Sequence, residues 1–204
     1  MKVTERIEAI DGTMARCYVY RNGKDTVLFD AGTRGSGRRV VEYFRRLGQQ
    51  PTHVLITHYH PDHIGGLRDI EEAFSPEIYC SPLEIAVVAG REKMTPSRSI
   101  LSRLVASLSS VKPVTSAKDF SKLEIEGITL LETPPGHTPG STSFIVEGEK
   151  AIVVGDAVYT RNGRLEVNRT FTLDMQKAEE SRKKIMQYKG YTVLPGHGGE
   201  TVTL

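Results

Sequence analysis

The chain contains no tryptophan and only two cysteines among its 204 residues, and its formal net charge is only +2. The small net charge and the lack of tryptophan as a base-stacking residue argue against a nucleic-acid partner. Cys17 and Cys80 lie far apart and outside any paired motif. We therefore expect free, inert thiols.

Long hydrophobic runs are also absent. No apolar stretch approaches the roughly 20 residues that a membrane-spanning helix requires, so no membrane partner is expected. The N-terminal residues Met1–Arg6 carry no apolar signal region, which predicts a cytoplasmic location. A chain of 204 residues fits a single domain, residues 1–204, with a full hydrophobic core.

The apolar pattern predicts an α/β protein. Strands are expected at residues 2–10, 15–20, 26–29, 52–57, 77–80 and 191–194, with hairpins at 123–131 and 142–154. Helices are expected at residues 36–47, 67–74, 82–89, 100–108 and 174–189. Each half is rich in strands and closes with helices, which favours two packed sheets with helices outside.

Residues 100–108 form an amphipathic segment with five apolar residues on one face: Ile100, Leu101, Leu104, Val105 and Leu108. We interpret this face as part of the core. The alternatives, which concern the whole stretch 90–112, are a cover over the substrate or the surface of a homodimer.

Residues 57–66, Thr-His-Tyr-His-Pro-Asp-His-Ile-Gly-Gly, concentrate four donor side chains within six positions. The donors are His58, His60, Asp62 and His63. A single histidine of this kind is usually a core or surface residue, but this density of nitrogen and oxygen donors indicates a bound metal. His58 and His60 are two positions apart in extended chain and point the same way. Pro61 then starts a turn, so Asp62 and His63 leave at another angle, which suggests two ligands for each of two metals.

Three further loops carry donor residues, and each follows a predicted strand: Gly136-His137-Thr138-Pro139-Gly140, Gly155-Asp156-Ala157-Val158-Tyr159 and Pro195-Gly196-His197-Gly198-Gly199. The remaining histidine, His53, lies inside a predicted strand and is assigned to the core or an edge. Adding His137, Asp156 and His197 makes seven donors. This number exceeds what one tetrahedral ion needs and suits two ions with a bridging carboxylate.

Together, the His-x-His-x-Asp-His run, the Gly-His-Thr-Pro-Gly loop, the Gly-Asp turn, the late Gly-His and the early Asp30-Ala31-Gly32 turn resemble the metallo-β-lactamase-fold hydrolases. The resemblance implies a four-layer αββα sandwich with a two-metal site along one edge. It implies that His58, His60 and His137 hold one metal, that Asp62, His63 and His197 hold the other, and that Asp156 bridges them. Two divalent ions are expected, with Zn²⁺ as the first choice and Fe or Mn as alternatives.

Within that superfamily the chain resembles the glyoxalase II and lactonase branches, although it lacks the C-terminal helical segment with which glyoxalase II binds glutathione. The resemblance implies a two-metal hydrolase whose metal-bound hydroxide cleaves a small carbonyl ester, thioester or lactone. Asp62 is a candidate for orienting the nucleophile. Tyr159 matches a lactonase-branch tyrosine that reaches the substrate carbonyl, and structural packing is its alternative role. The competing functions are a mononuclear iron persulfide dioxygenase and a phosphodiesterase or nuclease.

Overall fold

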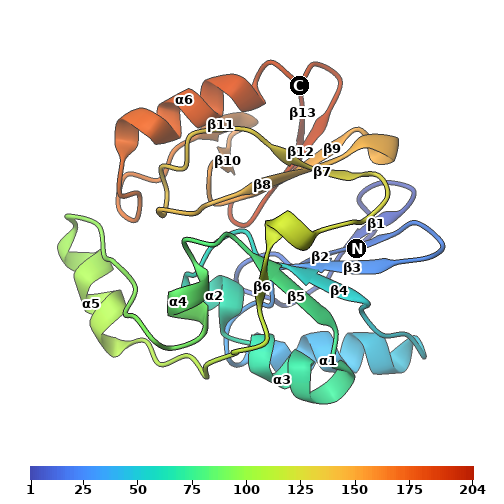
Figure 1. Cartoon of the computed structure of the whole chain (residues 1–204). Coiled ribbons are helices and arrows are strands. Elements are labelled where there is room, and N and C mark those ends of the chain that lie inside the picture. The colour runs from blue at the N-terminus through green and yellow to red at the C-terminus, as the bar shows by residue number, and fades with distance from the viewer. The chain divides into compact units, whose positions relative to one another are not determined.

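In the computed structural model, which describes residues 1–204, the chain divides into two units. Unit 1 comprises Met1–Lys93 and Ser110–Glu126, and unit 2 comprises Met94–Ser109 and Gly127–Leu204. Each unit is built around one large sheet (Figure 1). None of the helices has the length and apolar composition needed to cross a bilayer.

The sheet of unit 1 has six strands in the order β1-β2-β3-β4-β5-β6. The first three strands pair antiparallel, whereas β3, β4, β5 and β6 pair parallel. The carboxyl ends of β3, β4 and β5 therefore lie next to one another at one edge of the sheet, where loops can bring polar side chains together. The strands are β1 Ile7–Ala9, β2 Tyr18–Arg21, β3 Thr26–Phe29, β4 His53–Leu55, β5 Glu77–Cys80 and β6 Lys118–Asp119.

Strands β2 and β3 form a hairpin that turns at Asn22-Gly23, a dipeptide typical of hairpin turns. Asn22 Oδ1 accepts hydrogen bonds from the backbone N–H groups of Lys24 and Asp25, and Gly23 takes a positive φ of 93°. The loop contains four residues rather than the two that the dipeptide signal suggests, because Arg21 pairs with Thr26. The turn sets the register of the antiparallel half of the sheet.

The helices of unit 1 are α1 Ser36–Arg46, α2 Pro61–Ile64, α3 Leu67–Phe74 and α4 Ile85–Val88, with a short 3-10 turn, η1, at Phe120–Lys122. Helix α1 buries Val40 and Phe44, while its arginines lie on an exposed face. Helices α1 and α3 approach closely, since a Cβ atom at Gly66 would lie 2.5 Å from the Cα atom of Gly37. The predicted helices at 36–47 and 67–74 are thus confirmed to within a residue.

The sheet of unit 2 has five strands in the order β13-β12-β9-β8-β7, and β10 and β11 form a separate hairpin. Its buried residues include Ile145, Ile152, Val154 and Val193, which pack with Ile185 of α6. The elements are α5 Ile100–Leu108, β7 Ile128–Leu131, β8 Ser143–Val146, η2 Glu147–Glu149, β9 Ala151–Gly155, β10 Tyr159–Arg161, β11 Arg164–Glu166, α6 Met175–Ile185, β12 Thr192–Pro195 and β13 Val202–Thr203. Strands β9 and β12 run parallel and lie side by side (Figure 1), so the loops that follow them leave the same edge of the sheet.

The strand expected at 2–10 and the helices expected at 82–89 and 174–189 are shorter than predicted. One expectation about strand pairing and one about burial are wrong. The predicted hairpin at 123–131 does not form, because β7 pairs with β8, twelve residues further along the chain, and residues 123–125 are not in a strand. The alternating pattern of 128–131 identifies a strand correctly, but it does not specify the partner.

The apolar face of α5 is also not part of the core. Ile100 is 85% exposed and Leu108 is 75% exposed, whereas Ser102 is buried. The small polar side of the helix faces inward, where Ser102 Oγ accepts from the Ser97 backbone N–H and the Ser97 hydroxyl donates to the Thr170 carbonyl. Periodicity locates the helix, but it does not determine which face is buried.

Candidate metal centre

The first group of donors lies in unit 1 directly after β4. His60 is extended, with φ −62° and ψ 147°, and Pro61 is the first helical residue of α2, as predicted. His58 is buried, and its Nε2 atom lies 3.1 Å from Nδ1 of the half-buried His60. The spacing of two in extended chain therefore brings these imidazoles together on one side of the loop.

Asp62 and His63 come from α2, and His63 is held by Asp30, a carboxylate outside the seven donors. Asp30 follows β3, which lies beside β4 in the sheet, and its Oδ2 atom lies 2.8 Å from Nδ1 of His63. Asp30 is buried, and Oδ1 also accepts from the Thr57 backbone N–H at 2.8 Å. The signal in the sequence was a carboxylate directly after a buried strand, but its partner depends on which strands are neighbours.

The second group of donors lies in unit 2, at the ends of β7, β9 and β12. His137 is buried, Asp156 follows Gly155 at the end of β9, and His197 follows β12. Oδ2 of Asp156 lies 3.6 Å from Nε2 of His137 and 3.6 Å from Nε2 of His197. One carboxylate oxygen of Asp156 is therefore flanked by two imidazoles.

The three buried histidines share one feature, which is that Nδ1 faces a protein oxygen. The partner is Thr57 Oγ1 for His58 at 3.0 Å, Asp30 Oδ2 for His63 at 2.8 Å, and Thr172 Oγ1 for His137 at 3.2 Å. Such contacts fix the orientation of a metal-binding imidazole and direct Nε2 toward the ion. The seven donors are all nitrogen or oxygen atoms, a set that suits Zn²⁺, Fe²⁺ or Mn²⁺. The residues present therefore fit divalent metal ions.

The two thiols are not part of this donor set. Both cysteines are free and buried. Burial raises the pKa of Cys80 to about 12 and raises the pKa of Cys17 further. A thiol must lose its proton to act as a metal ligand or nucleophile, so both are inert at neutral pH, as expected.

His53 lies apart from the donors, as predicted. It occupies β4 between β3 and β5, where its ring stacks on Tyr79 with 6.2 Å between centroids. Its Nδ1 atom lies 2.8 Å from Thr52 Oγ1 and 3.7 Å from Asp25 Oδ1. These contacts account for a half-buried histidine without a metal.

Tyr159 lies in β10, opposite Glu166 of β11. Its hydroxyl donates a hydrogen bond to Glu166 Oε2 at 2.7 Å, and this bond raises the pKa of Tyr159. In this structure the hydroxyl therefore has a protein partner on the neighbouring strand.

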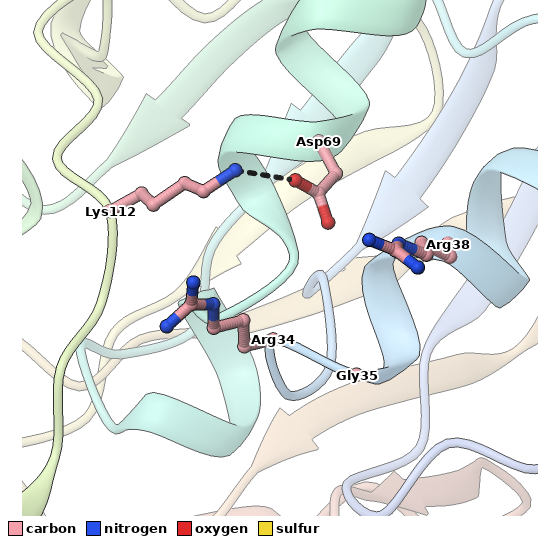
Figure 2. Close-up of a pocket in the computed structure, with 5 residues that line it drawn as sticks. All are labelled: Arg34, Gly35, Arg38, Asp69 and Lys112. Atoms are coloured by element: carbon pink, nitrogen blue, oxygen red, sulfur yellow. Dashed lines mark hydrogen bonds and ion pairs between the residues drawn. The ribbon is translucent and has the colours of Figure 1, made fainter.

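A solvent-open recess of about 420 Å³ lies elsewhere in unit 1, and it contains none of the seven donors. The recess is lined by Arg34, Gly35, Arg38, Asp69 and Lys112. Figure 2 shows Lys112 on one side of Asp69 and Arg38 on the other side. Lys112 Nζ lies 3.2 Å from Asp69 Oδ1. The side chains of Arg34 and Arg38 are exposed, as is usual for charged residues at the surface.

Most of the chain matches a known protein family. Residues 10–197 match the model of the metallo-beta-lactamase superfamily. The chain belongs to this superfamily. Among curated proteins, the probable metallo-hydrolase YflN of Bacillus subtilis is 32% identical over 197 residues, which cover 84% of this chain and 75% of YflN. The uncharacterized protein Rv2581c of Mycobacterium tuberculosis is 30% identical over 199 residues, which cover 91% of this chain and 86% of that protein.

Solved structures agree with this assignment. The di-iron-bound form of TTHA1623 is 23% identical to this chain and has a TM-score of 0.74. The match covers 96% of this chain and 93% of the TTHA1623 chain. The B3 metallo-beta-lactamase BLEG-1 is 25% identical with the same coverage and a TM-score of 0.72. The predicted α/β fold of the metallo-β-lactamase type is confirmed. Superfamily membership also supports a metal-dependent hydrolase at the level of the family.

Proposed function

We propose that the protein is a two-metal hydrolase that cleaves a small carbonyl ester, thioester or lactone. The observation that carries the proposal is the position of Asp156, whose Oδ2 atom lies 3.6 Å from Nε2 of both His137 and His197. Two ions held close together need a negatively charged bridge, because their mutual repulsion would otherwise separate them. A carboxylate flanked by two imidazoles suits that task.

The proposed ligand sets follow the family pattern. His58, His60 and His137 would hold one ion, Asp62, His63 and His197 would hold the other, and Asp156 would bridge. Within unit 1, the ligand atoms of His58 and His60 lie within 4.8 Å of each other, as do those of Asp62 and His63. Within unit 2, the same limit holds for His137 and Asp156. We propose Zn²⁺ as the metal, and metal analysis distinguishes it from Fe and Mn.

The charge balance of the donors favours a substrate that becomes negative as it reacts. Only Asp62 and Asp156 are anionic, so two dications would leave the centre positive and able to stabilise a carbonyl oxygen that gains charge. When bound, the ions would supply Lewis-acid polarisation and would lower the pKa of a water molecule to about 7. We propose that Asp62 orients the water molecule. We also propose that the Tyr159 hydroxyl gives up its hydrogen bond to Glu166 and donates to the substrate carbonyl instead.

The experiment is the substitution Asp156→Asn, which keeps the shape of the side chain and removes its charge. Protein purified with zinc should hold two ions per chain. The variant should lose at least one ion and most of its turnover on a panel of lactone, thioester, aryl ester and phosphodiester. It should also melt at a lower temperature, because metal binding stabilises the folded state. Glu200→Gln is the matched control, since it removes one exposed charge near His197 and should change neither quantity.

Three results would contradict the proposal. Wild-type metal content and turnover in Asp156→Asn would remove the bridging role. A reproducible single iron with oxygen-dependent activity on persulfides would replace the hydrolase with a dioxygenase. Turnover of the phosphodiester alone would leave the two-metal centre in place and change the substrate class.

A further inference from the structure

Glu84 is a buried carboxylate outside the seven donors. It lies between β5 and α4, it is 0% exposed, and its backbone N–H donates to the Ser81 carbonyl at 2.8 Å. Glutamate is rarely buried completely unless its carboxylate is paired, because removing the charge from water is costly. Such a residue therefore needs a structural or functional reason.

The contact of Glu84 provides this reason. Its Oε2 atom accepts a hydrogen bond of 2.7 Å from the backbone N–H of Tyr59. Tyr59 lies between the proposed ligands His58 and His60, and its own ring is buried. Strand β4 ends at Leu55, so the sheet supplies no ladder partner for a backbone donor at Tyr59. The carboxylate of Glu84 takes the place of that partner.

Asp30 makes a comparable contact on the other side of the loop. Its carboxylate accepts from the Thr57 backbone N–H at 2.8 Å. Asp30 follows β3 and Glu84 follows β5, and these are the two strands that flank β4 in the sheet. Two alternate residues of the loop after β4, Thr57 and Tyr59, are thus held by carboxylates from the loops that follow the two neighbouring strands.

We propose that Glu84 is a positioning residue of the metal centre, which fixes the Tyr59 peptide so that His58 and His60 face the same ion. The proposal rests on the proposed function only in that it requires a metal at these histidines. Side chains two apart point the same way only while the chain between them stays extended. Rotation of the Tyr59 peptide would turn the two imidazoles apart. A carboxylate is a strong acceptor for a backbone N–H and opposes this rotation.

The test compares Glu84→Ala, Glu84→Gln and the control Glu92→Ala. Glu92 is an exposed residue of the same unit, so its substitution removes one charge without a buried contact. Two quantities are measured in the full chain, and neither depends on turnover. These are the Zn²⁺ dissociation constant, by competition with a chelator, and the hydrogen-exchange rate of the Tyr59 amide in the metal-free protein.

Glu84→Ala should weaken Zn²⁺ binding by about 10- to 100-fold, the usual effect of removing a group that supports a ligand. It should also accelerate exchange of the Tyr59 amide. Glu84→Gln keeps a carbonyl acceptor, so its Zn²⁺ affinity and its protection of the Tyr59 amide should both be close to those of the wild type. Glu92→Ala should match the wild type in both measurements. If Glu84→Ala does not fold, Glu84→Gln decides, since its Tyr59 amide should stay protected and its Zn²⁺ affinity should stay close to wild type.

A folded Glu84→Ala with wild-type exchange at Tyr59 and wild-type affinity would overturn the proposal. A Glu84→Gln variant that protects the Tyr59 amide but loses as much Zn²⁺ affinity as Glu84→Ala would also overturn it. The negative charge of Glu84, and not its hydrogen bond to Tyr59, would then account for the affinity. A wild-type protein that binds Zn²⁺ and hydrolyses no member of the panel would refute the hydrolase while leaving this test in force. A wild-type protein that binds no metal would refute both.

Discussion

Gly136→Ala tests how the loop that carries His137 is held against α6. A Cβ atom at position 136 would lie 2.3 Å from the backbone nitrogen of Ala178, 2.7 Å from its Cα atom and 2.7 Å from the Asp174 carbonyl oxygen. All three are backbone atoms, so rotation of a side chain cannot relieve the overlap. Reaching ordinary van der Waals distance requires the loop and the start of α6 to separate by about 1 Å.

That separation acts on two backbone hydrogen bonds and on the position of His137. The Asp174 N–H donates to the Gly136 carbonyl at 2.9 Å, and the Leu173 N–H donates to the His137 carbonyl at 3.2 Å. Overpacking of this kind costs about 1–3 kcal/mol, which corresponds to a fall in Tm of roughly 2–12 °C in a chain of this size. A displacement of about 1 Å within a catalytic centre can lower turnover on the order of 100-fold.

The assay is urea denaturation and thermal melting of Gly136→Ala, together with its Zn²⁺ content and its turnover on the preferred substrate. Gly199→Ala is the control, because it lies two residues after His197 and an added Cβ atom there meets nothing within 4 Å. The control should match the wild type in all four measurements. If Gly136→Ala melts at the wild-type temperature and keeps its metal and turnover, close contact with α6 does not position His137.

Two further predictions concern the tyrosine and cysteine side chains. Tyr159→Phe should lower kcat by about 10- to 1,000-fold, as loss of a donor to the substrate oxygen does, and should leave metal content unchanged. Wild-type turnover in that variant would show that the hydroxyl has only a structural role, through its hydrogen bond to Glu166. Cys80 has a pKa raised from 9.0 to about 12, so the protonated thiol stabilises the fold fully below about pH 9, and this contribution is lost as the pH rises toward 12. The free energy of unfolding, measured in urea at stepped pH, should therefore fall more steeply over this range in the wild type than in Cys80→Ala, and equal slopes would contradict the assignment.

The local part of the metal centre could be predicted because it depends on short-range rules. A spacing of two in extended chain places His58 and His60 together, and Pro61 ends that extension and starts α2. Similarly, the Asp174 side chain caps α6 by accepting from the Lys177 backbone N–H, a local interaction that is typical of aspartate before a helix. Each of these features involves residues at most four positions apart.

Features that depend on partners distant in the chain could not be predicted in the same way. Alternation at 128–131 predicts a strand, but it fits a partner on either side, and the structure selects β8. The apolar face of α5 satisfies the local criteria for burial, yet the structure exposes it and buries the side that carries Ser102. Periodicity records which residues share a face, whereas burial depends on what lies opposite that face.

Asp30 and Glu84 show this division most clearly within the candidate centre. The sequence by itself determined the seven donors, their order and the turns that carry them, because donor chemistry and backbone restrictions are properties of neighbouring residues. It did not indicate that two other carboxylates support the loop of His58 and His60. Those roles arise only when β3, β4 and β5 lie side by side in parallel, which brings residues 30, 57–59 and 84 to one edge of the sheet. Buried carboxylates then bond the N–H groups that the end of β4 leaves without a strand partner, because an unpaired buried donor is costly.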